Sequence, residues 1–364
     1  MRIALFTDQG AHYRFPCFKA IDQASKNWGN VDFYIPDSNT GGLNILKGLG
    51  GLRSVRRIKN YTVSRSFFYQ THVVRACLSA KYDVVVLWGG INILTTWLAV
   101  LLSQVMAKRI VLWGHGYYGN EVLSVVRLRT LMYMGADYHL LYGEHGQRLL
   151  KKHLPSGRSD VIYNSLDVED IRQHVDTCRE LQKGDEWDLI FVGRITKVKN
   201  LGLLLDACEI LKGQGLVLKI LIVGDGKYLE ALINRAESMG LSAWFDWKGA
   251  CYDDKVLAQY FRKTKFCISP GNIGLMALHS LYNETAVITH GDMTAQMPEA
   301  EAVIDGVNGF LFRTLDASDL ASTIVRALSS DYLALTKECY SSISDKYTPE
   351  GQAVVFWRAM NEIS

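Results

Sequence analysis

Residues 189–200 read LIFVGRITKVKN. The first four residues form a short continuous apolar run, which is typical of a strand buried on both faces of a parallel sheet. Gly193 then permits a sharp turn, and Arg194 and Lys199 follow just before a helical pattern begins. Two cations at the carboxyl end of a strand, beside the start of a helix, suit a diphosphate group. The alternative is that they form only surface salt bridges.

The same pattern of a strand followed by a helix recurs along the chain. Strands are predicted in the first half at Arg2–Thr7, Val31–Ile35, Asp83–Trp88, Arg109–Trp113, Tyr138–Tyr142 and Asp160–Tyr163. Strands are predicted in the second half at Leu189–Val192, Leu218–Val223, Trp244–Trp247, Phe266–Ser269 and Ala286–Thr289. Helices are predicted in that half at Leu201–Lys212, Lys227–Met239, Asp253–Lys263, Leu275–Tyr282 and Ala317–Leu328. The alternation indicates an α/β protein with two doubly wound domains, whose boundary lies near Asn164–Asp188.

Composition excludes several classes of protein. The 364 residues are 48% hydrophobic and 21% charged, which argues against a disordered chain, collagen or a coiled coil. No apolar run reaches the roughly 18 residues that span a bilayer, and Arg2–Thr7 is predicted as a strand rather than a signal peptide. The seven cysteines are scattered, so we expect a cytoplasmic protein without a disulfide framework or a structural metal site.

The charge is divided unequally along the chain. Residues 1–165 hold 20 Lys and Arg against 9 Asp and Glu, whereas residues 166–364 hold 20 against 28. A basic half attracts anionic surfaces such as lipid headgroups or phosphorylated ligands. Within it, the glycine- and arginine-rich segment Gly41–Arg65 precedes Phe67-Phe68-Tyr69, which suits a membrane surface or a polyanion. The alternative is a solvated loop, and no nucleic-acid-binding motif accompanies the segment.

Two further strand ends carry residues that could contact a ligand. Gly224 lies in Val223-Gly224-Asp225-Gly226, which lacks a dinucleotide-binding fingerprint and by itself indicates a tight turn. Gly271 and Gly274, in Ser269-Pro270-Gly271-Asn272-Ile273-Gly274-Leu275, would let a ligand approach the backbone at a helix start. His279 lies one turn further along that helix and could face the same ligand, or it could be a core or surface histidine.

Together these segments resemble the donor domain of the retaining GT-B glycosyltransferases of family 4. The resemblance covers about 140 residues, from Leu189 to Leu328. It is carried by Val192-Gly193-Arg194 with Lys199, Ile222-Val223-Gly224-Asp225-Gly226, Trp247-Lys248-Gly249, Ser269-Pro270 and Asp305-Gly306-Val307-Asn308-Gly309-Phe310-Leu311. Asn164-Ser165-Leu166-Asp167 is similar to the family's motif at the domain junction.

The resemblance implies a GT-B fold, in which two Rossmann-like domains face a central cleft. Residues 1–165 would bind the acceptor and residues 166–348 the nucleotide-sugar donor. The helix at about 349–364 would pack back on the first domain. No resident cofactor is implied, because the nucleotide sugar, linked to UDP or GDP, is the substrate.

The resemblance also implies roles for individual residues. Arg194 and Lys199 would hold the donor diphosphate and stabilise it as it leaves. His115, in Trp113-Gly114-His115-Gly116, would face the transferred sugar, unless it is only a structural loop histidine. The other implied donor contacts are Gly193, Gly224, Gly271, Asn272, Ile273, Gly274, Leu275, His279 and one of Glu299 and Glu301. Gly10 and His12 would lie on the acceptor side.

The sequence departs from the family at one motif. The family usually has two glutamates eight positions apart, and here Gly271 and His279 occupy those positions. Asn272 is the nearest polar substitute for the first glutamate, and an imidazole at 279 could still hydrogen-bond a ribose hydroxyl. Asn283-Glu284 likewise replaces the usual pair of a small residue and glycine.

We therefore expect a glycosyltransferase that moves a sugar from a nucleotide diphosphate sugar to a hydroxyl of a polysaccharide or lipid-linked acceptor. It would act at the inner face of the cell membrane. The family mechanism implies retention without a metal ion, and Asp253-Asp254 is predicted as a helix cap rather than a metal ligand. Inversion would need a general base, for which His115 and Asp8 are candidates. The alternatives are an epimerase or phosphorylase of the same fold, or a degenerate protein that only binds a nucleotide sugar or polyanion.

Overall fold

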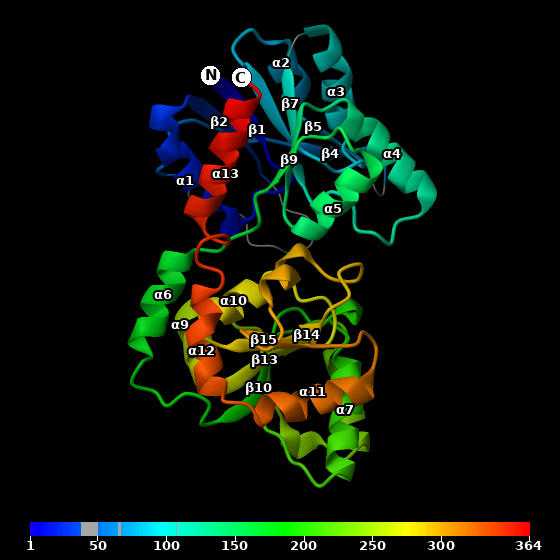
Figure 1. Cartoon of the computed structure of the whole chain (residues 1–364), viewed down its shortest axis with the longest axis vertical. Helices are drawn as coiled ribbons and strands as arrows, with labels where there is room; N and C mark the ends of the chain where they lie inside the picture. The colour runs from blue at the N-terminus through cyan, green and yellow to red at the C-terminus, as the bar shows by residue number, and fades with distance from the viewer. Residues whose placement is uncertain (38–49, 65–66, 107) are drawn as a thin grey trace. The chain divides into compact units, whose positions relative to one another are not determined.

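The computed structural model describes residues 1–37, 50–64, 67–106 and 108–364. The chain divides into two compact units, which we call unit 1 (Met1–Leu166 with Lys346–Ser364) and unit 2 (Asp167–Asp345). Figure 1 shows both units as layered α/β structures. Within the described ranges, no helix is both long enough and apolar enough to cross a membrane.

Unit 1 is built on a seven-stranded sheet in which every pairing is parallel, with the order β3-β2-β1-β6-β7-β8-β9. A separate antiparallel hairpin is formed by β4 and β5. The strands are β1 (Arg2–Phe6), β2 (Asn30–Pro36), β3 (Val55–Ile58), β4 (Asn60–Thr62), β5 (Phe68–Gln70), β6 (Val84–Trp88), β7 (Arg109–Gly114), β8 (Tyr138–Leu141) and β9 (Ser159–Val161). The helices are α1 (Phe15–Ala24), α2 (Val73–Leu78), α3 (Leu94–Met106), α4 (Leu123–Met134), α5 (Glu144–His153) and α13 (Pro349–Glu362).

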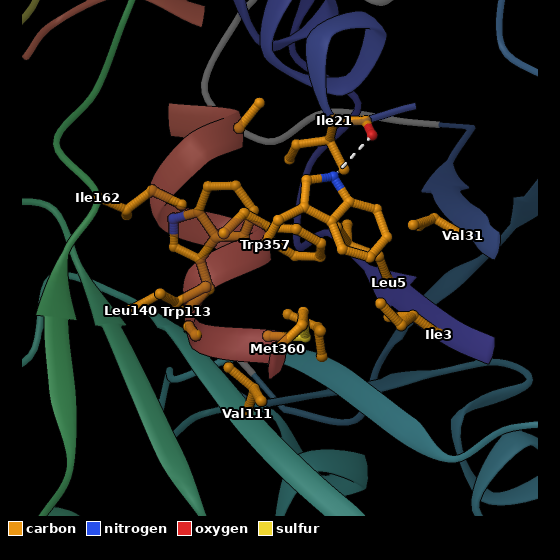
Figure 2. Packing of buried hydrophobic residues seen from close by; sticks show 14 of the residues in the cluster. Ile3, Leu5, Ile21, Val31, Val111, Trp113, Leu140, Ile162, Trp357 and Met360 are labelled. Atoms are coloured by element: carbon orange, nitrogen blue, oxygen red, sulfur yellow. Dashed lines mark hydrogen bonds between the residues drawn. The ribbon is translucent and has the colours of Figure 1, made fainter. Parts of the chain in front are cut away.

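The C-terminal helix α13 belongs to the core of unit 1. It packs against α1, and the indole Nε1 of Trp357 donates a hydrogen bond to the carbonyl oxygen of Ile21 at 3.0 Å (Figure 2). Phe356 and Met360 are fully buried in the same cluster as the apolar residues of β1 and β7. Residues more than 300 positions apart therefore share one hydrophobic core, which stabilises both helices on this face of the sheet.

Unit 2 contains a six-stranded parallel sheet with the order β12-β11-β10-β13-β14-β15. Its strands are β10 (Trp187–Val192), β11 (Ile220–Val223), β12 (Phe245–Gly249), β13 (Thr264–Ser269), β14 (Ala286–His290) and β15 (Gly309–Phe312). Its helices are α6 (Val168–Thr177), α7 (Leu201–Gly213), α8 (Leu229–Ser238), α9 (Asp254–Arg262), α10 (Met276–Tyr282), α11 (Ala317–Leu328) and α12 (Tyr332–Ser341). Short 3-10 helices also lie in the connections of the two units. They are η1 (His12–Arg14), η2 (Ser25–Asn27), η3 (Lys197–Lys199), η4 (Ser242–Trp244) and η5 (Pro298–Ala302).

The strand order reverses once in each sheet. The reversal falls between β1 and β6 in unit 1 and between β10 and β13 in unit 2. Connections leave these neighbouring strands in opposite directions, which opens a crevice at their carboxyl ends where α/β proteins bind ligands. The loops after β10 and β13 contain candidate donor-binding residues predicted from the sequence.

The structure corrects the solvated-loop alternative for part of the segment Gly41–Arg65. The alternative of a solvated loop is wrong for Val55–Ile58, which forms the edge strand β3, and for Asn60–Thr62, which forms β4. Two of the cations are already paired, since Arg53 contacts Asp22 at 3.2 Å and Arg57 contacts Asp37 at 3.9 Å. Residues 41–49 and Arg65 lie outside the described residues.

Candidate active site

The loops after β10 and β11 in unit 2 are held against each other by backbone contacts. Ile195 N–H donates to the carbonyl oxygen of Asp225 at 2.8 Å, and Gly193 N–H donates to that of Val223 at 2.9 Å. A β-carbon at position 224 would overlap the carbonyl oxygen of Gly193. Gly224 therefore allows the two loops to run side by side, which sets the backbone position of Gly193 and of Arg194 after it.

Lys199 joins the loop after β10 to the loop after β13. Its Nζ donates to the carbonyl oxygen of Asn272 at 2.7 Å, and its own carbonyl accepts from Gly271 N–H at 3.0 Å. Burial lowers the pKa of Lys199 to about 8, with Glu299 raising that pKa and Arg194 lowering it. Lys199, Arg194 and Glu299 therefore lie close enough to interact electrostatically at the point where the strand order reverses.

Gly271 has a different role from the one expected. We expected it to let a ligand approach the backbone, but a β-carbon here would overlap the carbonyl oxygen of Val198 and crowd the backbone of Lys199. The space beside Gly271 is thus filled by the chain itself. A glutamate at 271 would require the loop carrying Lys199 to move.

Gln296 was not among the residues singled out from the sequence. Its side chain is buried, its Oε1 accepts from Ile273 N–H at 2.8 Å, and its Nε2 donates to Thr289 Oγ1 at 2.9 Å and to the His290 carbonyl oxygen at 3.0 Å. The sequence pattern indicates Glu299 and Glu301, a few residues further on, as candidates, and no local pattern indicates Gln296. Gln296 and Lys199 hold the loop at Asn272–Ile273 from two sides.

The remaining candidates of unit 2 lie at the start of α10 and in η5. Gly274 has a φ of 59° and Leu275 is the residue before the first helical position of α10. His279 Nε2 lies 3.6 Å from Asp254 Oδ1, and its ring meets that of Phe261 edge-on. Its ring therefore contacts residues of α9. In η5, Glu299 is buried and interacts with Lys199, whereas Glu301 is half-buried.

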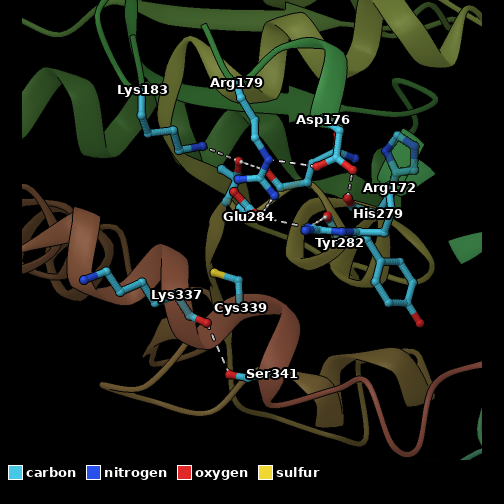
Figure 3. A network of polar contacts seen from close by, with 12 residues as sticks. Arg172, Asp176, Arg179, Lys183, His279, Tyr282, Glu284, Lys337, Cys339 and Ser341 are labelled. Carbon is cyan, nitrogen blue, oxygen red and sulfur yellow. Dashed lines mark hydrogen bonds and ion pairs between the residues drawn. The ribbon is translucent and has the colours of Figure 1, made fainter. Parts of the chain in front are cut away.

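Glu284 takes part in an ion-pair network (Figure 3). It has a φ of 55°, the left-handed conformation that favours glycine, at the turn between α10 and β14. Arg172 contacts its Oε1 at 2.9 Å and Arg179 at 3.6 Å. Two guanidinium groups thus stabilise a glutamate where the resembling family has a small residue and glycine.

His115 is the central candidate of unit 1. It follows β7, and its ring lies 5.2 Å from that of Tyr142, 5.6 Å from that of Tyr118 and 5.9 Å from that of Trp88. Its Nδ1 is buried and has no hydrogen-bond partner among the described residues. Burial, followed by the charges of Arg14 and Arg129, lowers the pKa of His115 to about 4. The imidazole is therefore neutral at pH 7.

Arg14 was also missed from the sequence. Its Nη1 lies 3.1 Å from Asp8 Oδ1, and its guanidinium lies 4.7 Å from the centre of the Trp88 ring. Arg14 and Trp88 line a small cavity at the carboxyl ends of β1 and β6. Thr7 and Trp113 line it too, and their side-chain polar atoms have no partner among the described residues. The cavity thus offers hydrogen-bonding groups beside a cation.

The expected acceptor-side residues Gly10 and His12 lie just before Arg14. Gly10 is buried in the connection between β1 and η1, and His12 is exposed at the first position of η1. Arg14, two residues after His12, therefore makes the contacts with Asp8 and Trp88. A polar tripeptide, His12-Tyr13-Arg14, directly after a glycine loop is the signal that would have pointed to Arg14.

Metal-ligand geometry is not seen in the described part of the chain. No group of three or more His, Cys, Asp or Glu side chains there is arranged to hold an ion. Asp253 caps α9, since its carboxylate accepts from the backbone N–H of Lys255 and Val256.

Comparison with known proteins links this geometry to a class. Residues 177–342 match the family model described as Glycosyl transferases group 1. The chain is similar over its whole length to solved structures that share this architecture. Its fold is GT-B. The matches support the GT-B glycosyltransferase class.

Three of these solved structures show the degree of similarity in sequence and fold. HepE from Anabaena, in complex with UDP and glucose, is 14% identical with a TM-score of 0.69, and the match covers 100% of both chains. The lipopolysaccharide outer core galactosyltransferase WaaB is 14% identical with a TM-score of 0.74, over 100% of this chain and 99% of that one. A TarM mutant from S. aureus, in complex with Fondaparinux, alpha-GlcNAc-glycerol and UDP, is 10% identical with a TM-score of 0.67, over 99% of both chains. No curated protein sequence matches the chain.

Proposed function

We propose that this GT-B protein transfers a hexose from a UDP- or GDP-linked sugar to a hydroxyl of a polysaccharide or lipid-linked glycan. The observation that carries the proposal is the arrangement of Arg194 and Lys199 at the strand reversal of unit 2, with Lys199 tied to Asn272. A pair of cations at this edge of a doubly wound sheet suits a diphosphate. The UDP complexes of HepE and TarM support the same class of donor.

The proposed reaction makes one bond and breaks one at the anomeric carbon. The bond to the diphosphate oxygen breaks, a bond to the acceptor oxygen forms, and the acceptor's proton passes to the leaving phosphate on the same face. Negative charge therefore develops on the diphosphate, where Arg194 and Lys199 would stabilise it. These two cations would fill the role that a metal ion has in other transferases, so we propose transfer without a metal ion. Reaction on the same face of the sugar would give retention.

On the acceptor side, His115 would hydrogen-bond the transferred sugar as a neutral imidazole. Its lowered pKa makes it a weak base, and Asp8 is engaged in an ion pair with Arg14. Both observations favour retention over inversion, since inversion needs an effective general base. Gly10 and the cavity beside Arg14 would lie near the acceptor.

The experiment is a panel of UDP- and GDP-linked sugars, first in a thermal-shift assay and then in an assay of donor hydrolysis. We expect one nucleotide sugar to raise the melting temperature, because a ligand of the folded state stabilises it. Arg194→Ala should lower kcat/KM for that sugar about 100-fold. The control is Lys337→Ala, which removes an exposed cation of α12. Equal turnover by Arg194→Ala and the wild type would contradict the proposal.

A second candidate is a protein of the same fold that binds a nucleotide sugar or polyanion without turnover. The observation that favours it is Gly271, beside which the backbone of Val198 and Lys199 leaves no room for a carboxylate. This candidate gains if the wild type binds a nucleotide sugar but neither hydrolyses it nor transfers its sugar to any acceptor in the panel.

We place the proposed reaction in the cytoplasm, at the inner face of the membrane. The basic composition of residues 1–165 supports a site near anionic lipid. A lipid-linked acceptor would be reached there without the protein spanning the bilayer.

A further inference from the structure

The three aromatic rings that contact the His115 imidazole come from three different connections of unit 1. Trp88 ends β6, Tyr142 follows β8, and Tyr118 lies in the loop between β7 and α4. The Nδ1 atom of His115 is buried and has no hydrogen-bond partner among the described residues. Because no hydrogen bond at this atom fixes the ring, the orientation of the imidazole depends on the packing of its aromatic neighbours.

Tyr118 is itself held in place by two side chains. Its backbone N–H donates to Glu121 Oε2 at 3.0 Å, and the N–H of Gly119 donates to the same oxygen at 2.9 Å. Its carbonyl oxygen accepts from His145 Nε2 at 3.2 Å. The Tyr118 ring lies 5.6 Å from that of His115, with 30° between the two planes. Glu121 and His145 therefore fix the backbone position from which this ring reaches His115.

Arg129 of α4 connects the same carboxylate to the ring of Tyr118. Its Nη2 lies 3.2 Å from Glu121 Oε1, and both side chains are only 9% exposed. Its guanidinium lies 5.6 Å from the centre of the Tyr118 ring. A buried ion pair is costly to desolvate and is weak evidence for stability, and here Arg129 Nε also lacks a partner among the described residues. Stability alone therefore explains this pair poorly, whereas both of its members contact Tyr118.

We infer that Tyr118 is a positioning residue, which holds the imidazole of His115 in the orientation that sugar transfer uses. Glu121 fixes the backbone of Tyr118 and Arg129 fixes its ring, so both act on His115 through Tyr118. The inference rests on the proposed function, in which His115 contacts the transferred sugar, and it deepens that function by naming the residues that orient the imidazole. A small displacement of a group that contacts the reacting sugar lowers the rate strongly.

The first test is a double-mutant cycle on kcat for sugar transfer. Tyr118→Leu should lower kcat about tenfold, whereas Tyr118→Phe, which keeps the ring, should stay within about twofold of the wild type. In the His115→Gln background Tyr118→Leu should have no further effect, because Tyr118 acts through the imidazole. The control is Tyr61→Leu, at an exposed tyrosine of β4, which should keep the wild-type kcat.

Two results of the cycle would overturn the inference. One is an equal loss of kcat from Tyr118→Leu in the wild-type and His115→Gln backgrounds, which would show that Tyr118 acts independently of the imidazole. The other is an unchanged kcat in Tyr118→Leu. The dissociation constant for UDP or GDP should stay at the wild-type value in every variant of the cycle, because the proposed diphosphate site lies in unit 2. A variant that weakens nucleotide binding as strongly as it lowers kcat would also contradict a role specific to His115.

The second test needs no turnover, so it separates this inference from the proposed function. The NMR signal of the His115 ring in the free protein is assigned by its loss in His115→Gln. We expect Tyr118→Leu to shift this signal, and Tyr118→Phe and Tyr61→Leu to leave it in place. An unchanged signal in Tyr118→Leu would overturn the inference. A wild type that transfers no sugar would sink the proposed function, whereas the NMR signal would still show whether Tyr118 holds the ring.

A further variant covers the case in which Tyr118→Leu loses its thermal unfolding transition. Arg129→Lys keeps a cation beside Glu121 but removes the flat guanidinium from the Tyr118 ring. We expect it to shift the His115 signal and to lower kcat, and to have no further effect on kcat in the His115→Gln background. A wild-type signal together with a wild-type kcat in Arg129→Lys would overturn the inference.

Discussion

The ammonium group of Lys199 lies 2.7 Å from the carbonyl oxygen of Asn272, so a cation on the loop after β10 is held by the loop after β13. This contact crosses the reversal of strand order in unit 2. The ammonium group is also buried, and this burial lowers the pKa of Lys199 to about 8. The carbonyl of Asn272 therefore holds the proposed diphosphate-binding lysine in place, while burial sets its protonation.

Nucleotide binding should weaken above pH 8. Below that pH the free protein carries Lys199 as a cation, and above it the cation is lost, so binding of an anionic diphosphate must then include proton uptake. We expect the dissociation constant for UDP or GDP to rise between pH 7 and pH 9. Lys199→Arg should flatten this dependence, because guanidinium stays protonated. Isothermal titration calorimetry at both pH values measures it, and identical slopes in the two proteins would contradict the assignment.

Gln296 should act as a positioning residue for the loop at Asn272–Ile273. Gln296→Leu leaves the Ile273 N–H without its acceptor in a buried site, which costs about 1–3 kcal/mol. We expect weaker nucleotide binding by up to about a hundredfold if that loop contacts the donor. Gln296→Glu, which keeps the acceptor oxygen, should retain more affinity than the leucine variant. The exposed Gln214→Leu is the control. Nucleotide affinity that is the same in all four proteins would limit Gln296 to a structural role.

The pH–rate profile of the wild type should show no acidic limb near pH 6.5 from titration of His115. Its pKa in the folded protein is about 4, so the imidazole is already neutral throughout the range from pH 5 to pH 8. We expect His115→Gln to lower kcat/KM for transfer while leaving the shape of the profile unchanged. Steady-state rates from pH 5 to pH 8 provide the measurement. A wild-type limb near pH 6.5 that disappears in the variant would show that the histidine titrates during turnover.

Lys183 should make unit 2 more stable as pH rises from 7 to 9. It is buried, with Nζ donating to the Phe261 carbonyl oxygen at 2.8 Å and to Thr285 Oγ1 at 2.7 Å, and burial lowers its pKa to about 7. The unfolded chain keeps a lysine proton up to about pH 10.5, so above pH 7 it binds a proton that the folded chain lacks. Stability therefore rises with pH in this window.

The variant Lys183→Met should remove that contribution. The slope of unfolding free energy against pH should fall by as much as about 1.4 kcal/mol per pH unit. Denaturant titrations at pH 7, 8 and 9 measure this slope. Lys337→Met, which removes an exposed lysine of α12, should keep the wild-type slope (Figure 3). If Lys183→Met also keeps it, Lys183 is protonated throughout the window.

Several features of the fold and site were predictable because they depend on short stretches of chain. Apolar runs such as Leu189–Val192 predicted strands whose bounds differ from the observed ones by a few residues, as β10 begins at Trp187. The edge strand β3 was missed because Arg56 and Arg57 interrupt its apolar pattern. Glycine-rich strand ends pointed to the loops at the sheet reversal of unit 2, since ligand loops follow the carboxyl ends of parallel strands.

By itself, then, the sequence determined the alternation of strands and helices, the two doubly wound domains and the residue types at their strand ends. These follow from local hydrophobic periodicity and from glycine's conformational freedom. Only the tertiary structure decided that Lys199 bonds Asn272, that Gln296 holds Ile273, and that aromatic rings surround His115. Such contacts join residues far apart in the chain, and they depend on strand order and side-chain packing, which local patterns do not encode.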